Sequence, residues 1–185
     1  MNNFLTYDFK SIVPSDLKSH RILMIGRGGT KMKRFKLGIV AMKYIVKEIP
    51  DCQMNILSSV SGMNDEKKLV KLYNLQNNIL FLGYISEPSI YFKNASLHIF
   101  PSLNEAYPMV LGEMKAYGIP SILVGLDYIT LSKGGTVIVY DESPMTIAKE
   151  SIDILKNETL RKKIGKDARE SLKLYDNNVI FKKWI

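Results

Sequence analysis

The chain has 185 residues, of which 26 are Lys or Arg and 18 are Asp or Glu, so its formal net charge is +8. This length supports one domain that buries roughly 70% of its unfolded surface. A single cysteine, Cys52, excludes an intramolecular disulfide and a thiolate metal cluster, which fits a reducing cytoplasm. No apolar run approaches the ~18 residues of a membrane span. The charge admits a nucleic acid, an anionic lipid or an anionic substrate, but without a zinc-finger, RNA-recognition or helix-turn-helix signature we expect no nucleic-acid partner.

The chain begins with a segment of irregular polarity, residues 1–20, which we interpret as a linker or extension before a domain at residues 21–185. The first clear strand follows at residues 21–26, which read RILMIG. It opens into a glycine-rich, basic loop that reads RGGTKMKR. A helix is predicted from the end of this loop to residue 48, because the apolar positions recur at helical spacing and Pro50 follows.

Two familiar phosphate-binding loops can be tested against this basic loop. A dinucleotide-binding fingerprint needs glycine at the position of Lys31, and it needs an acidic residue after the next strand, which is absent. A Walker loop also needs glycine at Lys31, followed by a Lys-Ser or Lys-Thr pair. The sequence therefore excludes both loops.

Strands and helices alternate along the rest of the chain. The patterns predict strands near residues 53–58, 79–82, 96–100, 120–124 and 136–140, and helices near residues 65–75, 88–94, 108–117, 144–156 and 158–174. This alternation indicates an α/β fold, a three-layer Rossmann-like sandwich with a parallel sheet of about six strands. His98 alternates with apolar neighbours in one of these strands and lies far from His20 in sequence, so we expect a core histidine and no metal site.

Two glutamates flank the start of the helix expected at residues 108–117. Glu105 lies in the loop before this helix, and Glu113 lies eight positions further on, inside it. The two carboxylates therefore do not form a pair on one helical face. They would instead contact one ligand at two different depths along its length, at the carboxyl end of a strand, where open α/β sheets hold their ligands.

The segment EAYPMVLGEMKAYGIP, residues 105–120, resembles the Glu-x7-Glu signature of retaining glycosyltransferases with the GT-B architecture, above all family 4. Ala106 stands where that family favours glycine. The basic loop resembles the family's Gly-Arg and Lys segment, with Arg27 as the arginine and Lys33, or alternatively Lys31, as the lysine. The resemblance extends from about residue 21 to the C-terminal region at residues 175–184, and it corresponds to the second, donor-binding domain of the family.

This resemblance implies a site for a nucleoside diphosphate sugar, with no cofactor beyond this donor and no metal. Arg27 and Lys33 would hold the diphosphate, Glu113 would accept from ribose hydroxyls, and Glu105 would accept from sugar hydroxyls. Fixed cations suit this chemistry because a leaving nucleoside diphosphate gains negative charge as the glycosidic bond breaks. The resemblance implies further donor contacts from Gly28, from Tyr84 or Ile85 beside the base, from Gly134 and Gly135, which could instead form an ordinary turn, and from the helix start at Ala106, Tyr107, Pro108, Met109 and Val110.

We therefore expect the donor-binding half of a retaining, metal-independent hexosyltransferase that builds cell-surface polysaccharide or glycolipid. Its expected location is the cytoplasm, with the inner face of the membrane and a lipid-linked acceptor as an open alternative. The family's acceptor domain is missing from this sequence, so the chain would be an excised piece, a truncated product or a half that works with a partner chain. Two rival functions stay open, namely a non-catalytic interaction or regulatory module and a sugar-nucleotide epimerase, for which the chain displays no acid/base residues.

Overall fold

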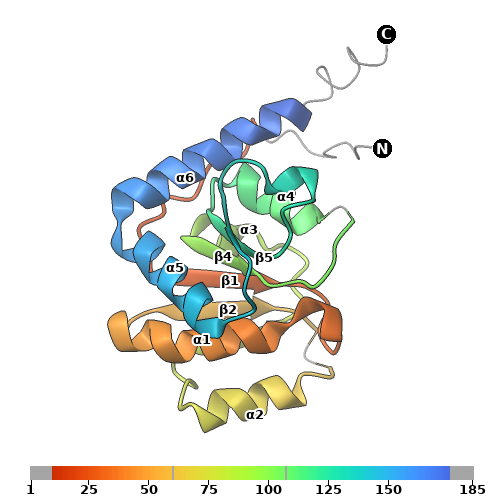
Figure 1. The fold of residues 1–185 in the computed structure, drawn as a ribbon, viewed down its shortest axis with the longest axis vertical. Coiled ribbons are helices and arrows are strands. Elements are labelled where there is room, and N and C mark those ends of the chain that lie inside the picture. Colours follow the sequence, from red (N-terminus) through yellow and green to blue (C-terminus); the bar gives the residue numbers. More distant parts are fainter. Residues whose placement is uncertain (1–9, 60, 107, 176–185) are drawn as a thin grey trace.

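The six predicted strands form one sheet in the structure, a computed structural model that describes residues 10–59, 61–106 and 108–175 (Figure 1). The strand order is β3-β2-β1-β4-β5-β6, and every neighbouring pair is parallel. This confirms the predicted α/β class and the parallel sheet of six strands. The strands are β1 (Arg21–Ile25), β2 (Gln53–Leu57), β3 (Ile79–Gly83), β4 (Leu97–Phe100), β5 (Ser121–Val124) and β6 (Thr136–Val139).

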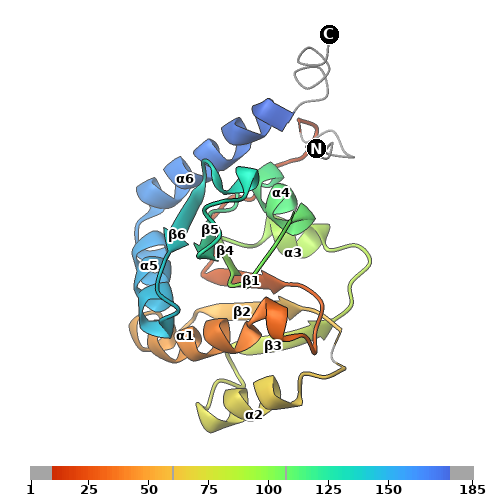
Figure 2. The ribbon, with the colours of Figure 1, turned by 45° about the vertical axis from the view of Figure 1, so that its right-hand side comes forward.

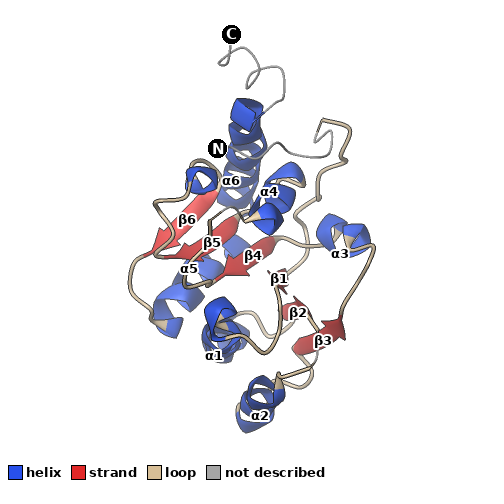
Figure 3. Ribbon diagram, turned by 90° about the vertical axis from the view of Figure 1, so that its right-hand side faces the viewer, coloured by secondary structure: helices blue, strands red, loops and turns tan. Residues whose placement is uncertain are grey.

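Helices cover both faces of the sheet and complete the three layers. In Figure 3, α1, α2 and α5 lie on one side of the strands, whereas α3 and α4 lie on the other. The last helix, α6, packs against α4 and α5, and β3 and β6 form the two ends of the sheet (Figure 2). The helices are α1 (Phe35–Glu48), α2 (Asn64–Leu72), α3 (Ser89–Lys93), α4 (Met109–Ala116), α5 (Pro144–Lys156) and α6 (Glu158–Ser171), with the short 3-10 helices η1 (Lys31–Lys33), η2 (Thr130–Ser132) and η3 (Leu172–Tyr175).

The order of the strands reverses between β1 and β4, and this reversal decides where a ligand can lie. From β1 the chain proceeds to β2 and β3 on one side, and then it returns to β4 on the other side of β1. Crossover connections therefore leave the carboxyl ends of β1 and β4 in opposite directions. Open α/β sheets hold ligands in the crevice that forms at such a switch point.

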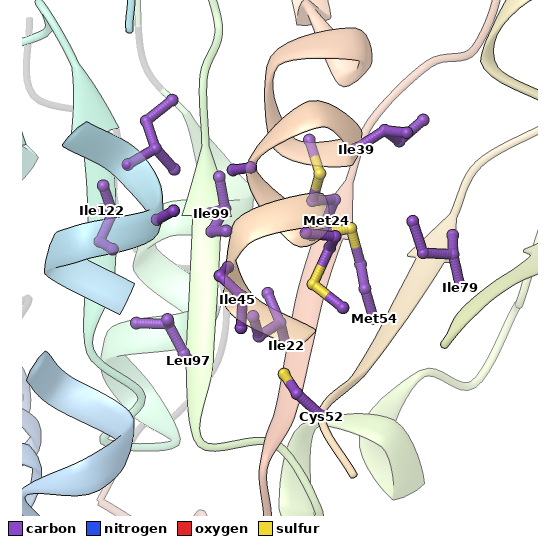
Figure 4. Close-up of a cluster of buried hydrophobic side chains, with 14 of the residues drawn as sticks. Ile22, Met24, Ile39, Ile45, Cys52, Met54, Ile79, Leu97, Ile99 and Ile122 are labelled. Carbon is purple, nitrogen blue, oxygen red and sulfur yellow. The ribbon is translucent and has the colours of Figure 1, made fainter. Parts of the chain in front are cut away.

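The main core lies between the sheet and α1. Ile22 and Met24 of β1 pack there against Ile39 and Ile45 of α1, and all four side chains are at most 1% exposed (Figure 4). A Cβ atom on Gly38 would lie only 2.3 Å from Sδ of Met24, so this glycine lets α1 approach β1 closely. The close packing fixes the start of α1, and with it the basic loop that joins β1 to α1.

Gly134 and Gly135, expected near the donor phosphate or sugar, lie at the opposite edge of the sheet. They precede β6, so they sit at the amino end of a parallel strand, whereas the two glutamates follow or flank the carboxyl end of β4. A Cβ atom on Gly135 would lie 2.2 Å from Cα of Ala168, so the turn packs directly on α6. Of the two alternatives left open for these glycines, the structure favours the ordinary turn, because they allow close packing between that turn and α6.

A buried lysine holds the same turn in place. Lys115 of α4 is fully buried, and its Nζ donates to the carbonyl oxygens of Lys133, at 2.8 Å, and of Gly134. It also donates to the hydroxyl of Ser171 at 2.8 Å. Burial lowers the pKa of Lys115 to about 8. These three bonds tie α4 to the turn before β6 and to α6, on the side of the sheet that also carries Glu113.

The described part of the N-terminal segment packs along the amino edge of the sheet. The Ser15 amide donates to the carbonyl oxygen of Tyr117 at 2.9 Å, and the Ser15 hydroxyl donates to that of Ala95 at 2.6 Å. Leu17 is 6% exposed, and its carbonyl oxygen accepts from Nε of Arg161 at 2.7 Å. A domain boundary at residue 20 remains a prediction, although residues 15–17 are bonded to the domain.

Candidate functional site

The basic loop after β1 and the glutamate loop after β4 lie at the same edge of the sheet. Both loops follow the carboxyl ends of adjacent parallel strands, paired in register at Ile22 with Leu97 and at Leu23 with His98. The amide of Leu103 donates to the carbonyl oxygen of Met32 at 2.8 Å, so the two loops are also joined directly. Glu105 and the basic loop therefore share the carboxyl edge of the sheet, where the glutamates were expected.

The ion pair of Lys33 and Glu105 is the central contact between these loops. Nζ of Lys33 donates to Oε1 of Glu105, and the two side chains are 24% and 15% exposed. The same ammonium lies 5.5 Å from the ring centroid of Phe100, the last residue of β4. The Glu105 amide donates to the Tyr128 hydroxyl at 3.2 Å, and that hydroxyl donates to Asn104 at 2.7 Å. A cation and a carboxylate are thus held side by side at the carboxyl edge of the sheet, where the strand order reverses.

Arg34, the residue after Lys33, also joins the basic loop to the loop after β4. Its Nε donates to the carbonyl oxygen of Pro101 at 2.5 Å, and its Nη2 donates to those of Ser102 at 3.1 Å and Val124 at 3.3 Å. Its Nη1 pairs with Glu142 at 2.5 Å. The backbone of Arg34 is left-handed, with φ 44° and ψ 41°, which costs a residue with a Cβ atom roughly 1–2 kcal/mol.

A cleft of about 470 Å³ opens beside these loops on the α3 and α4 side of the sheet. It brings together four of the predicted residues, namely Arg27, Tyr84, Ile85 and Glu113. Tyr84 is 84% exposed and stands at the rim. The other lining residues come from the ends of β1 and β2 and from α3 with the loop before it: Ile25, Gly26, Leu57, Ser58, Ser59, Pro88 and Phe92.

Glu113 lines this cleft, most of whose other lining residues are apolar. Burial raises the pKa of Glu113 above its usual value. Burial also raises the pKa of Tyr117, the residue after α4, and the charges of Glu113 and Glu87 add to that effect. The ring of Tyr117 contacts Phe92 edge to face, with centroids 5.2 Å apart. A desolvated carboxylate in such a place binds hydroxyl donors strongly, because few waters compete for its oxygens.

The start of α4 faces the same edge of the sheet. Pro108 is the residue before the helix, and no side chain caps the helix there. Its carbonyl oxygen accepts from the amides of Leu111 at 3.0 Å and Gly112 at 3.4 Å. Of the other residues predicted at this helix start, Ala106 and Met109 are exposed and Val110 is half-buried, whereas Tyr107 lies outside the described residues.

Two further residues of the basic loop have different surroundings. A Cβ atom on Gly28 would lie 2.3 Å from the carbonyl oxygen of Ser59, so this glycine lets the loop after β1 contact the loop after β2. Gly28 thus shapes one wall of the site, and its contact with a ligand remains a prediction. Lys31 is exposed, whereas Lys33 is half-buried beside Glu105, which favours Lys33 over Lys31.

The sequence did not indicate Arg34, Tyr128 or Phe92 as residues of this edge. Each depends on a contact between distant segments, for example that of Arg34 with the ends of β4 and β5. In the described ranges no group of three His, Cys, Asp or Glu side chains is placed to hold a metal ion. None of the helices described here is long and apolar enough to cross a membrane.

The strand order and the edge site define a Rossmann-like domain that is one half of the GT-B architecture. Residues 8–171 match the model of the family Glycosyl transferases group 1, and the chain belongs to this family. It is 26% identical over 177 residues to the poly(glycerol-phosphate) alpha-glucosyltransferase of Bacillus subtilis strain 168, a match that covers 93% of this chain and 26% of that protein.

Solved structures show the same fold. The C-terminal domain of LpcC, a glycosyl transferase group 1 family protein from Francisella tularensis, has a TM-score of 0.75 at 18% identity, with 90% of this chain and 96% of that chain covered. A TarM mutant from S. aureus, solved with UDP, has a TM-score of 0.80 at 19% identity, with 94% of this chain and 36% of that chain covered. The chain therefore corresponds to the C-terminal domain of a GT-B protein, and it spans about a quarter of the Bacillus relative's length.

Proposed function

We propose that this chain is the nucleotide-sugar-binding half of a retaining glycosyltransferase that builds cell-surface polysaccharide or glycolipid. One observation carries the proposal: two cations and two carboxylates, Arg27, Lys33, Glu105 and Glu113, gather at the switch point of a GT-B half. The printed functions of the relatives support it, since the Bacillus protein is a glucosyltransferase and the TarM structure contains UDP.

The diphosphate of the donor would lie between Arg27 and Lys33. Arg27 lines the cleft at the start of the basic loop, and Lys33 lies near the end of the same loop, beside Glu105. In this role the two cations, together with the start of α4, stabilise the negative charge that develops on the leaving diphosphate. Lys33 then exchanges part of its contact with Glu105 for a phosphate oxygen.

The nucleoside would occupy the cleft itself. The desolvated carboxylate of Glu113 suits a ribose diol, because each carboxylate oxygen accepts a hydroxyl hydrogen. Tyr84, Ile85 and Phe92 supply an apolar wall on which the flat face of a base can pack. The sugar would then lie towards Glu105, whose carboxylate accepts from its hydroxyls.

Transfer would need an acceptor held against the anomeric carbon by a second domain or a partner chain. Orientation of the two reactants supplies ~7–11 kcal/mol of such a barrier. We therefore expect this chain alone to bind the donor and to transfer no sugar. Robust transfer by the isolated chain would contradict the half-enzyme model while leaving the donor site intact.

A thermal-shift screen of nucleoside diphosphates and nucleotide sugars tests the proposal. A ligand present at 100 times its Kd stabilises the folded chain by ~2.7 kcal/mol, which is a clear upward shift of Tm. We expect at least one nucleoside diphosphate to produce this shift, and Arg27→Ala to reduce it. If no nucleotide shifts Tm, a non-catalytic interaction module becomes the better account.

A further inference from the structure

We infer that Arg34 is a positioning residue of the donor site. It holds the glutamate loop, residues 101–108, against the basic loop, so that the backbones that carry Lys33 and Glu105 keep their positions when a ligand comes between the two side chains. The inference rests on the proposed function. It concerns a residue whose side chain does not line the cleft and whose three nitrogen atoms all have protein partners.

Two consecutive side chains fasten the glutamate loop at its two ends. Arg34 binds the start of the loop through the carbonyl oxygens of Pro101 and Ser102, and Lys33 binds it further on, at Glu105. A diphosphate that binds Lys33 weakens the second fastening, because the ammonium then shares its charge between two anions. The bonds from Arg34 to this loop are unaffected, since they go to the backbone carbonyl oxygens of Pro101 and Ser102.

The guanidinium suits this task better than any other side chain. It reaches the carboxyl ends of β4 and β5 at once, through Ser102 and Val124, and also Glu142 after β6. A lysine has one nitrogen and could not span these partners in a fixed geometry. The side chain of Arg34 is 12% exposed, so water competes little with these bonds.

The backbone conformation supports a role beyond the stability of the fold. Arg34 is one of three non-glycine residues with positive φ in the described part of the chain, and glycine would adopt that conformation without strain. Strained backbone at a site persists only when the surrounding contacts determine it. The contacts that determine it here are those that fix Lys33, one residue earlier, opposite Glu105.

Hydrogen exchange in the ligand-free protein tests whether Arg34 clamps the glutamate loop, that is, whether it holds this loop against the basic loop. The probe is the Leu103 amide, which donates to the carbonyl oxygen of Met32 in the middle of the clamped loop. Arg34→Gln should accelerate its exchange by about tenfold, because the loop opens more often. Arg34→Gly should do the same while keeping the fold, since glycine suits this backbone. The matched control is Glu48→Gln, which removes the exposed ion-pair partner of Lys156 and should leave the exchange unchanged.

Calorimetry with UDP tests the consequence for binding. Arg34→Gln should weaken UDP by about tenfold in the native background and hardly at all in a Lys33→Ala background, because Arg34 acts through Lys33. Equal losses in both backgrounds would overturn the inference, and so would unchanged exchange of the Leu103 amide. Failure of the native chain to bind UDP and the other nucleoside diphosphates would instead refute the proposed function, and the exchange experiment would still decide whether Arg34 clamps the loop.

Discussion

Lys33 and Glu105 are separated by 72 positions in the sequence, yet they form an ion pair at the carboxyl edge of the sheet. The pair brings the cation proposed for the diphosphate into contact with the carboxylate proposed for the sugar. Without a ligand, each group therefore neutralises the other. A nucleoside diphosphate has to compete with Glu105 for Lys33, whereas an intact donor sugar offers Glu105 new partners in return.

This competition predicts opposite effects of Glu105→Gln on two ligands. The affinity for UDP should rise, by about threefold for a partly exposed ion pair, because Lys33 loses its competing anion. The affinity for the matching UDP-sugar should fall relative to UDP, because the carboxylate no longer accepts from the sugar hydroxyls. Calorimetry with both ligands measures the difference, with Glu48→Gln, which removes the exposed partner of Lys156, as the matched control. Equal losses for the two ligands would argue against the division of roles.

Glu113 should behave differently, since the ribose is common to both ligands. Glu113→Gln should weaken UDP and the UDP-sugar alike, by about tenfold, because one strong charged hydrogen bond is replaced by a neutral one. The same pair of titrations measures this. A loss confined to the UDP-sugar would place Glu113 beside the sugar and contradict the present arrangement.

The contrast between these residues and Arg34 shows how far the sequence could predict the site. The apolar runs located the strands, and the rule for parallel sheets then placed Glu105 and the basic loop at one edge. No local pattern indicates that Arg34 would adopt a left-handed backbone and reach β4 and β5, because that depends on contacts across the sheet. For a related reason the sequence could not decide between a donor contact and an ordinary turn for Gly134 and Gly135, because α6, on which their turn packs, lies further along the chain.

Because His98 is buried, we expect the protein to lose stability in mild acid. Its side chain is fully buried in β4, with Nδ1 at 3.1 Å from the Ser121 hydroxyl and with no partner for Nε2 among the described residues. Burial, together with the charge of Lys33, lowers the pKa of His98 to about 3. Between pH ~6.5 and ~3 the unfolded chain therefore binds a proton that the folded chain does not.

The free energy of unfolding should accordingly fall as pH decreases, by about 2 kcal/mol from this residue between pH 6.5 and pH 5. Urea unfolding across this range measures the effect. His98→Gln should flatten the dependence, whereas His20→Gln, which changes a half-exposed histidine paired with Asp51, should leave most of it in place. An unchanged slope in His98→Gln would assign the effect to other groups.

Cys52 should be inert in the folded protein. It is fully buried beside β2, and burial raises the pKa of its thiol to about 12. Because the thiolate is the reactive form, alkylation at pH 8 should be negligible until the chain unfolds. Lys163→Cys, on the exposed face of α6, supplies an accessible thiol for comparison. Rapid labelling of Cys52 under native conditions would show that the core opens locally.

The most direct test of the account is the affinity of the native chain for UDP, measured by calorimetry alongside Arg27→Ala, Lys33→Ala and Lys163→Ala. Each variant removes one positive charge, so attraction by the net charge of +8 predicts equal losses in all three. A site at the switch point predicts losses of roughly 1–3 kcal/mol for Arg27→Ala and Lys33→Ala. The affinity of Lys163→Ala should stay unchanged. Equal losses in the three variants, or no binding of UDP or any other nucleoside diphosphate by the native chain, would contradict the donor-site assignment.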